Sequence, residues 1–527
     1  MPAVDRQRQE RRVVGDDDAS REPGHGRGRA CWPEGRLLRC AAVRFPPVAP
    51  APLRRLVLLG AVMECGFVAM LFTPTGPGRT LAFLVLFFAV FACYVLAVRQ
   101  VLGRADGTGW TIVGLACLFR LTFVFAAPVL SDDLQRYLWD GRVTLDGGNP
   151  YIAFPASPAG AARGDADIGP LAHKEVATVY PPAAQLLFAG GAALGPGIYG
   201  IKILVVLLDL LVIAVLRALL RERGRPGLRV LIYAWNPLAV TETAWSGHIE
   251  PAATLCVLLA AVWIIQKREA GATFALAAGG LVKVVPLILI APLLRRIRAR
   301  HLPIVPVAVT LAYWPFRAAG RLLFAGLREY ADRWLGNESL FGVVHAAIVW
   351  MNPTPGLKAA IACVRRSVPH TSGLDRLYGY VYPIDLAKGA CALAVLGFAA
   401  WLVRRDVEPL RGLYWMSGAL LLLSPTAHPW YFLWVLPWLC LFPSPPWILL
   451  SGLVALAYAN LGASGRAGEP YPWIRLAEYG PFYCLAGAGW LRARLRVRRG
   501  IGGAAAAGTV DDSGRGRAAC IARPAPR

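Results

Sequence analysis

Two neighbouring aspartates, Asp132 and Asp133, are the side chains of this chain best suited to acid–base chemistry. They follow an apolar run, 110–130, that is long enough to cross a bilayer. At a membrane boundary, desolvation raises the pKa of a carboxyl group, and adjacent acids resist ionising together. One of the two could therefore accept a proton from a hydroxyl group of a lipid-bound substrate. Two solvated acids that merely end a helix would give the same pattern.

The residues after this pair supply further candidate ligands. Arg136 could tune the pKa of its acidic neighbours or neutralise an anion, and Tyr137 and Asp140 are candidate substrate-binding residues. The sequences Asp140-Gly141 and 148–151 are typical of turns. We therefore expect a short amphipathic segment followed by a tight loop.

A second polar stretch contains Glu242, His248 and Glu250, together with Trp245. Indole rings cover the apolar C–H faces of sugars, and carboxylates accept hydrogen bonds from sugar hydroxyls. The stretch follows Asn236-Pro237, a sequence that kinks or ends a helix. The three polar residues are therefore candidate sugar ligands, although an interfacial belt of aromatic residues would look similar.

Three more candidates lie farther along the chain. Lys283 interrupts an apolar segment, where a cation is costly unless it is paired, and a lipid-linked phosphate would be a suitable partner. A lysine that reaches to the membrane surface is the simpler alternative. His428 begins a polar turn and could bind a phosphate, and Trp334 lies in an amphipathic segment that could cap a cleft.

Composition indicates which class of protein holds these residues. The chain has 527 residues, of which 56% are hydrophobic and only 17% are charged, too few to cover a soluble protein of this size. The net charge of +24 would suggest nucleic-acid binding in a soluble protein. Here most of the arginines lie in short loops and tails, so we expect no nucleic-acid partner. The 11 cysteines are scattered and show no disulfide or metal-binding spacing.

Recurring apolar runs predict an all-α polytopic membrane protein with about 12 transmembrane helices. Two further pieces, 183–196 and 272–292, fit partly inserted or hairpin elements better, because Lys283 and two glycines interrupt the second. The expected spans are 56–73, 81–98, 110–130, 201–220, 229–243, 251–267, 302–316, 383–403, 410–426, 430–443, 446–461 and 477–491.

The basic clusters fall on one side of this topology, for example in 217–229, 295–300 and 492–499, with the exception of Arg365/Arg366 in a long outer segment. By the positive-inside rule both termini are cytoplasmic, and the candidate site residues face the outer side. The expected domain organisation is a disordered basic cytoplasmic tail (1–52), a transmembrane domain (53–495) with a catalytic outer loop (131–182) and a second outer segment (317–382), and a disordered cytoplasmic tail (496–527).

Several of these motifs in this order resemble bacterial membrane glycosyltransferases of the GT-C superfamily. The resemblance is to the polyprenol-phosphate-mannose-dependent mannosyltransferases and their glycosyltransferase-87-like relatives, and it covers roughly residues 55 to 490. The motifs are the acidic pair, Asp133-Leu134-x-x-Tyr137, Asp140-Gly141, Asn149-Pro150-Tyr151, Tyr180-Pro181-Pro182, Asn236-Pro237, Gly247-His248, a mid-helix Lys283-x-x-Pro286 and His428-Pro429-Trp430-Tyr431.

The resemblance implies a GT-C-like helical bundle with re-entrant and amphipathic outer segments, in which the family's catalytic aspartate falls on Asp133, with Asp132 beside it. It also implies inverting transfer of a hexose, most commonly mannose, from a polyprenyl-phosphate donor to a glycolipid or cell-envelope glycan. The reaction would take place on the outer face of the inner (plasma) membrane. No cofactor is expected, although Asp132 and Asp133 could bind a divalent ion.

Three other functions are compatible with the residues. A transporter or flippase of lipid-linked sugars would show interrupted helices in two matched halves. A polysaccharide polymerase or ligase would depend on arginine and histidine in the outer segments. A membrane scaffold without activity would tolerate substitution of Asp133.

Overall fold

The protein is helical throughout the residues that the computed structural model describes, and the predicted fold class, an all-α polytopic membrane protein, is confirmed. In this described part the only pairing of β type is an isolated bridge between Gly336 and Thr426. The tail predicted for 1–52 lies outside it. The described residues are 53–73, 78–103, 109–163, 171, 173–367, 377–461 and 472–506, and all of them belong to one unit of the chain, 41–527.

Four helical segments of the described part are long and apolar enough to cross a membrane. Three of them, α2 (Arg79–Leu102), α7 (Tyr199–Glu222) and α18 (Pro383–Arg404), coincide with predicted spans. The fourth, Ala299–Arg333, joins α13 (Ile304–Tyr313) to the helices that follow it and contains the predicted span 302–316. Most other predicted spans are shorter helices, or helices interrupted by tighter or wider turns.

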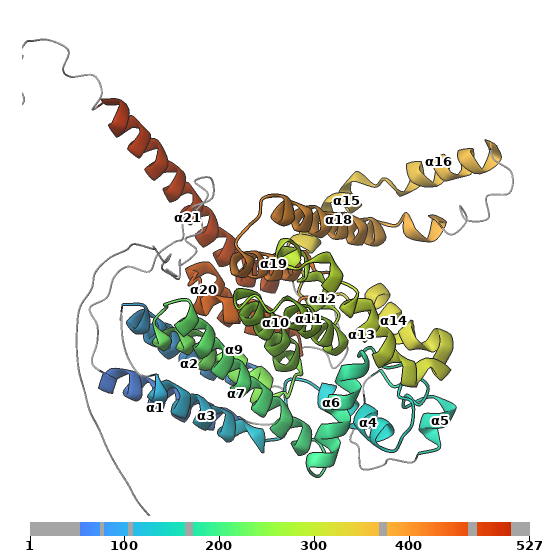
Figure 1. The fold of residues 1–527 in the computed structure, drawn as a ribbon, viewed down its shortest axis with the longest axis horizontal. Helices are drawn as coiled ribbons and strands as arrows, with labels where there is room; N and C mark the ends of the chain where they lie inside the picture. The colour runs from blue at the N-terminus through green and yellow to red at the C-terminus, as the bar shows by residue number, and fades with distance from the viewer. Residues whose placement is uncertain are drawn as a thin grey trace, which may run out of the picture. The chain divides into compact units, whose positions relative to one another are not determined.

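The first helices pack side by side through aromatic residues. α1 (Leu53–Leu71) lies against α2 and α3 (Trp110–Val124), and α3 lies against α7 (Figure 1). Phe67 of α1 contacts the rings of Phe119 and Phe123 of α3 at centroid distances of 5.1 and 5.6 Å. The predicted span 110–130 is too long, because the helix ends at Val124 and the ammonium group of Lys202 donates hydrogen bonds to the carbonyl groups of Phe123 and Ala126.

The predicted amphipathic segment after the acidic pair is α4 (Asp133–Leu145), which packs against α6 (Pro182–Leu194). Figure 1 shows these helices close to the short α5 (Pro158–Ala161). A Cβ atom at Gly141 would lie 2.4 Å from the carbonyl oxygen of Phe188, so glycine permits this approach. The piece 183–196, predicted to be partly inserted, is thus one short helix held against α4 and α7.

The predicted span 229–243 is broken at its Asn-Pro sequence. Helix α8 (Leu231–Ala234) ends there, and the side chain of Asn236 caps α9 (Pro237–Val240) by accepting hydrogen bonds from two backbone N–H groups. A π-helical turn (Thr241–Trp245) follows, and α10 (Glu250–Ile265) begins after a short loop. Proline causes the break, because it removes a backbone donor and clashes with the preceding turn.

The segment 272–292, expected to be a partly inserted or hairpin element, is also discontinuous. Helix α11 (Glu269–Val282) is followed by α12 (Val285–Ile288) and by a 3-10 helix (Ala291–Arg296). Lys283 has extended backbone angles, φ −143° and ψ 143°, so the expected mid-helix position of this lysine is wrong. Pro286 explains the break, because its ring would collide with the carbonyl group of Val282 in a continuous helix.

Most of the remaining helices lie in the second half of the chain. α15 (Leu340–Met351) and α18 enclose a small separate core that includes Phe341 and Cys391.

The last helix, α21 (Pro472–Ala506), continues past residue 495, where the transmembrane domain was expected to end. Residues 507–527 lie outside the described part. The other α-helices of this part are α14 (Ala325–Arg333), α16 (Thr354–Ser367), α19 (Pro409–Leu423) and α20 (Pro445–Leu453). The 3-10 helices not yet described are Gly227–Val230, Ala299–His301, Trp314–Phe324, Tyr378–Tyr380, Pro429–Trp434, Leu436–Cys440 and Val454–Leu461.

Candidate active site

A cavity of about 120 Å³ brings together residues that are far apart in the sequence. Five parts of the chain contribute to it: the first turn of α4, the irregular segment before α6, the break at Lys283, the end of α14 and the turn that contains His428. Six of the residues predicted from the sequence line it. The lining residues are Asp132, Asp133, Arg136, His173, Val176, Ala177, Val179, Tyr180, Lys283, Tyr330, Trp334, His428, Trp430 and Tyr431.

The two aspartates differ in environment although they are neighbours in the chain. Asp132 is the exposed residue that precedes α4, and Asp133 is the first residue of that helix, with 33% of its side chain exposed. Partial desolvation of its carboxyl group and repulsion by Asp133 raise the pKa of Asp132. Burial would also raise the pKa of Asp133, but His248, with help from Lys283 and His428, holds it below its usual value. Asp133 is therefore ionised at neutral pH and free to accept a proton.

His248 lies beneath Asp133 between two carboxylates. Its Nδ1 atom is 3.4 Å from Oδ2 of Asp133, and its Nε2 atom is 3.4 Å from Oε2 of Glu242. Tyr458 donates a hydrogen bond of 2.5 Å to the other oxygen of Glu242. His248 and Glu242 are fully buried and do not line the cavity.

The turn before His248 fixes this arrangement. Gly247 has φ 72°, in the left-handed region that favours glycine. A Cβ atom there would lie 2.7 Å from a methyl group of Leu134, the residue after Asp133 in α4. Glycine thus lets the loop approach α4 closely enough for the imidazole to reach the aspartate.

Lys283 contributes the cation of the site. It forms an ion pair with Glu250, whose side chain is fully buried, while 12% of the lysine side chain remains exposed toward the cavity. Its Nζ atom lies 4.9 Å from the ring centroid of Tyr431 and 5.8 Å from that of Tyr180. The break in the helix places the ammonium group here with a carboxylate and two aromatic faces, all of which stabilise a cation.

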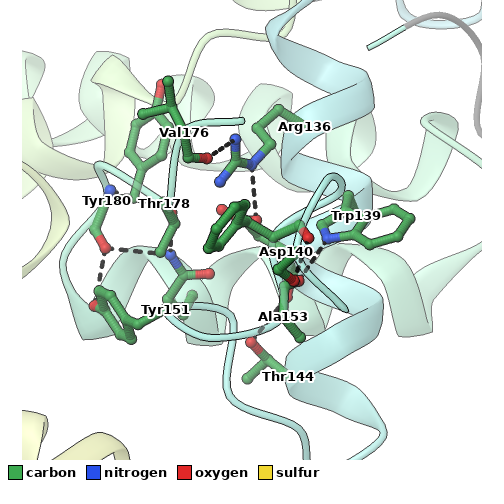
Figure 2. Close-up of polar contacts among 12 residues, drawn as sticks. Arg136, Trp139, Asp140, Thr144, Tyr151, Ala153, Val176, Thr178 and Tyr180 are labelled. Carbon is green, nitrogen blue, oxygen red and sulfur yellow. Dashed lines mark hydrogen bonds and ion pairs between the residues drawn. The ribbon is translucent and has the colours of Figure 1, made fainter. Parts of the chain in front are cut away.

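Arg136 is held rigidly at the edge of the cavity. Its Nε atom donates to Asp140 at 2.9 Å, and Nη1 donates to the carbonyl oxygen of Val176 at 2.9 Å (Figure 2). The remaining nitrogen, Nη2, is buried and has no partner within the described residues. Asp140 is fully buried and does not line the cavity, so in this structure it acts on the site through Arg136.

Tyr137 also lies behind the cavity. Its hydroxyl group lies 3.0 Å from that of Tyr180 and 3.3 Å from Oδ2 of Asp133. Its ring stacks on Phe188 at a centroid distance of 4.4 Å. Tyr137 therefore contacts the side chain of Asp133 rather than the open space.

Aromatic rings form the opposite walls. Trp430 stacks on both His248 and His428, at centroid distances of 3.9 and 4.4 Å. Burial lowers the pKa of His428 to about 4, so this imidazole is neutral at neutral pH. Two further lining residues, Trp334 and Tyr330, stack on each other at a centroid distance of 5.5 Å. Such a wall suits the apolar faces of a sugar.

Sequence reasoning did not single out several lining residues. His173, Tyr180, Tyr330, Trp430 and Tyr431 were not among the candidates, although four of these are aromatic residues in or beside the predicted motifs. The high frequency of tyrosine and tryptophan in the outer segments was the available signal. Conversely, Trp245 is buried against Phe123 and does not line the cavity. Over the described chain, no cluster of three His, Cys, Asp or Glu side chains could hold a metal ion.

Comparison with known families gives two matches that follow one another along the chain. Residues 58–297 match the sequence model described as "Alpha-(1->6)-mannopyranosyltransferase, N-terminal domain". Residues 374–473 match the one described as "MptB C-terminal domain". Together the matches cover more than half of the chain. Comparison with curated proteins and with solved structures found no match.

Proposed function

The chain belongs to the alpha-(1->6)-mannopyranosyltransferase family and is a membrane glycosyltransferase, and we propose that its donor is a mannose linked to a polyprenyl phosphate. The acceptor in this proposal is a hydroxyl group of a glycolipid or cell-envelope glycan. The observation that carries the proposal is that an ionised acid, Asp133, and a cation, Lys283, line the same cavity from separate segments.

In the proposed reaction Asp133 acts as general base. Its carboxylate accepts the proton of the acceptor hydroxyl group as that oxygen attacks the anomeric carbon of the sugar. The bond between the anomeric carbon and the phosphate oxygen breaks, and its electron pair leaves with the lipid phosphate. Attack from the face opposite the leaving group inverts the configuration, through a transition state that resembles an oxocarbenium ion.

Lys283 and Arg136 would stabilise the departing phosphate. Lys283 brings a positive charge, and Arg136 has one buried guanidinium nitrogen without a hydrogen-bond partner among the described residues. Fixed donors and charges in a site sheltered from water are often the largest contribution to catalysis. His428, neutral and lining the same cavity, would donate a hydrogen bond to the sugar or phosphate or accept one from it.

A second, smaller cavity supports a lipid-linked donor. It is lined almost entirely by apolar side chains of α10, α12 and the two 3-10 helices after His428, among them Ala253, Pro286 and Trp434. One of its lining residues, Val285, lies two positions after Lys283 in the sequence. Another, Trp434, stacks on Tyr431 of the first cavity at a centroid distance of 4.4 Å. This cavity of about 20 Å³ has room for a single methyl-sized group, so it offers an apolar surface for the first isoprene unit of a donor whose phosphate lies at Lys283.

The proposed location is the inner (plasma) membrane, with both termini cytoplasmic and the cavity on the outer face. The distribution of basic residues supports this orientation, because the arginine-rich loops fall on the side away from Asp133.

Membranes that contain the wild-type protein test the proposed donor directly. They would be incubated with radiolabelled polyprenyl-phosphate mannose and, separately, with the glucose and arabinose carriers, in the presence of total cell lipids. We expect label from the mannose carrier to appear in a glycolipid or glycan product. Transfer from another carrier alone would overturn the choice of sugar. The absence of transfer from all three, with label crossing the membrane instead, would favour a transporter.

A further inference from the structure

The contacts of His248 are unusual for a fully buried histidine. Neither ring nitrogen has a hydrogen-bond partner of good geometry among the described residues. The groups within 3.4 Å are the carboxylate of Asp133 on one side and that of Glu242 on the other. A buried imidazole with unsatisfied nitrogens is costly, so these two carboxylates are the partners that can stabilise it.

A count of protons shows what the arrangement requires. A neutral imidazole has one donor and one acceptor nitrogen, whereas two ionised carboxylates offer only acceptors. Both contacts are satisfied when the imidazole is protonated, or when Glu242 carries the proton and the imidazole is neutral. The three side chains therefore form one coupled set.

We propose that His248 and Glu242 are positioning residues for the base: His248 orients Asp133 and keeps it ready to accept a proton, and Glu242 takes up the imidazole proton when Asp133 is protonated. This inference rests on the proposed function of Asp133. It differs from the sequence-based expectation that both residues hold sugar hydroxyls, because neither faces the cavity.

The proton balance runs through these three side chains. At rest, His248 donates Nδ1–H to Asp133 and Nε2–H to Glu242. When the acceptor hydroxyl gives its proton to Oδ1 of Asp133, the Nε2 proton moves to Oε2 of Glu242. Neutral His248 still donates Nδ1–H to Oδ2 of Asp133. After the product leaves, Asp133 releases its proton to the cavity and Glu242 returns the other to Nε2.

The surroundings favour a protonated imidazole. Burial alone would lower the pKa of His248, but the contacts with Asp133 and Glu242, together with the charge of Glu250, raise it above its usual value. Asp132 adds a further negative charge nearby. Two nearby basic groups could oppose it: His428, which is neutral at neutral pH, and Lys283, whose charge is paired with that of Glu250. Tyr458 holds the far carboxylate in place through its hydrogen bond to Glu242.

The test is the pH dependence of kcat/KM in the full-length protein, measured with the mannose carrier. Without His248, burial raises the pKa of Asp133. The carboxylate then becomes protonated, and can no longer act as a base, already at a higher pH. We expect His248→Gln to move the acid limb upward by about one pH unit, with the KM for the donor nearly unchanged. At low pH, His248→Gln should therefore lose roughly tenfold more activity relative to the wild type than it does at high pH.

Two further variants separate positioning from a merely structural role. In His248→Asn the amide nitrogen takes the place of Nδ1, so this variant should keep the acid limb closer to that of the wild type than His248→Gln does. Glu242→Gln should lower kcat, and combining it with His248→Gln should add little, because both changes disrupt the same chain. Thermal unfolding of each detergent-purified variant shows whether it is folded.

An unchanged acid limb in folded His248→Gln, or full additivity in the double variant, would overturn the inference while leaving Asp133 as base. Wild-type activity of Asp133→Asn would instead overturn the proposed function itself. If His248→Gln does not fold, the kcat of Glu242→Gln decides, because an unchanged kcat in that folded variant would also overturn the inference. Tyr458→Phe alters only the Glu242 end of the chain and should leave the limb close to that of the wild type.

Discussion

Lys283 and Glu250 form an ion pair in which the two partners have opposite exposure. The carboxylate is fully buried at the start of α10, and the ammonium group, presented by a break between two helices, reaches the cavity. A buried carboxylate is costly without a partner, so the pair holds the lysine where an anionic substrate can reach it.

Replacing Lys283 with methionine should lower kcat by about 10²- to 10³-fold, the usual loss when one donor to a developing charge is removed. It should also lower the melting temperature, because Glu250 is left buried without its partner. The double variant Lys283→Met/Glu250→Gln should recover stability without recovering activity. Recovery of both would show that the lysine only stabilises the fold.

The apolar cavity next to Lys283 should contact the first isoprene unit of the donor. We expect Ala253→Val to raise the KM for polyprenyl-phosphate mannose severalfold, because the two added methyl groups fill a cavity of about 20 Å³. The KM for an analogue with a methyl group in place of the polyprenyl chain should change little. Ala392→Val, at an exposed position of α18, is the matched control. Equal effects of Ala253→Val on both donors would argue against this position of the lipid.

The turn before His248 should not tolerate a side chain. Gly247→Ala would put alanine in the left-handed region, which costs about 1 to 2 kcal/mol, and would push against Leu134. We expect a lower melting temperature and a lower kcat. Gly190→Ala, at a helical position with open space, should be neutral or slightly stabilising. Similar behaviour of the two variants would contradict the strain assigned to Gly247.

A buried ion pair away from the cavity ties α3 to α7 and to the broken helix. Arg120 lies 2.5 Å from Asp209, and Tyr233 donates to the same carboxylate. Arg120→Met should destabilise the protein by about 3 to 5 kcal/mol because it leaves Asp209 uncompensated. The double variant Arg120→Met/Asp209→Leu should be less destabilised than this single variant, as followed by thermal unfolding. A larger loss in the double variant would show that the pair itself is strongly stabilising.

The fold class and many of the site residues could be predicted from the sequence, but the spatial arrangement of these residues could not. Hydropathy identifies α2, α7 and α18 because each is a continuous apolar helix. The rule that ionisable residues in apolar segments are expensive singled out Lys283. The interruption expected at Lys283 is present as a break between α11 and α12, whereas the mid-helix position given to this lysine in the motif Lys283-x-x-Pro286 is wrong, because Pro286 does not allow a continuous helix.

The contacts between distant segments could not be predicted. Nothing in the local sequence places His248 beneath Asp133, 115 positions earlier, or Glu250 against Lys283. These contacts depend on how α4, α10 and α11 pack, and on glycines that allow close approach. Hydrophobic periodicity reports which face of a helix is buried, but it does not report which helix covers that face.

The most direct test of the account compares Asp133→Asn with Asp132→Asn in membranes that contain equal amounts of each protein. Transfer from radiolabelled polyprenyl-phosphate mannose would be measured across a range of pH. We predict that Asp133→Asn loses activity by about 10²- to 10⁴-fold, as expected for removal of a general base. Asp132→Asn should retain most of the wild-type activity, because Asp132 is exposed and it is Asp133 that lies 3.4 Å from His248. Near-normal transfer by Asp133→Asn, with loss in Asp132→Asn, would contradict the assignment of the base.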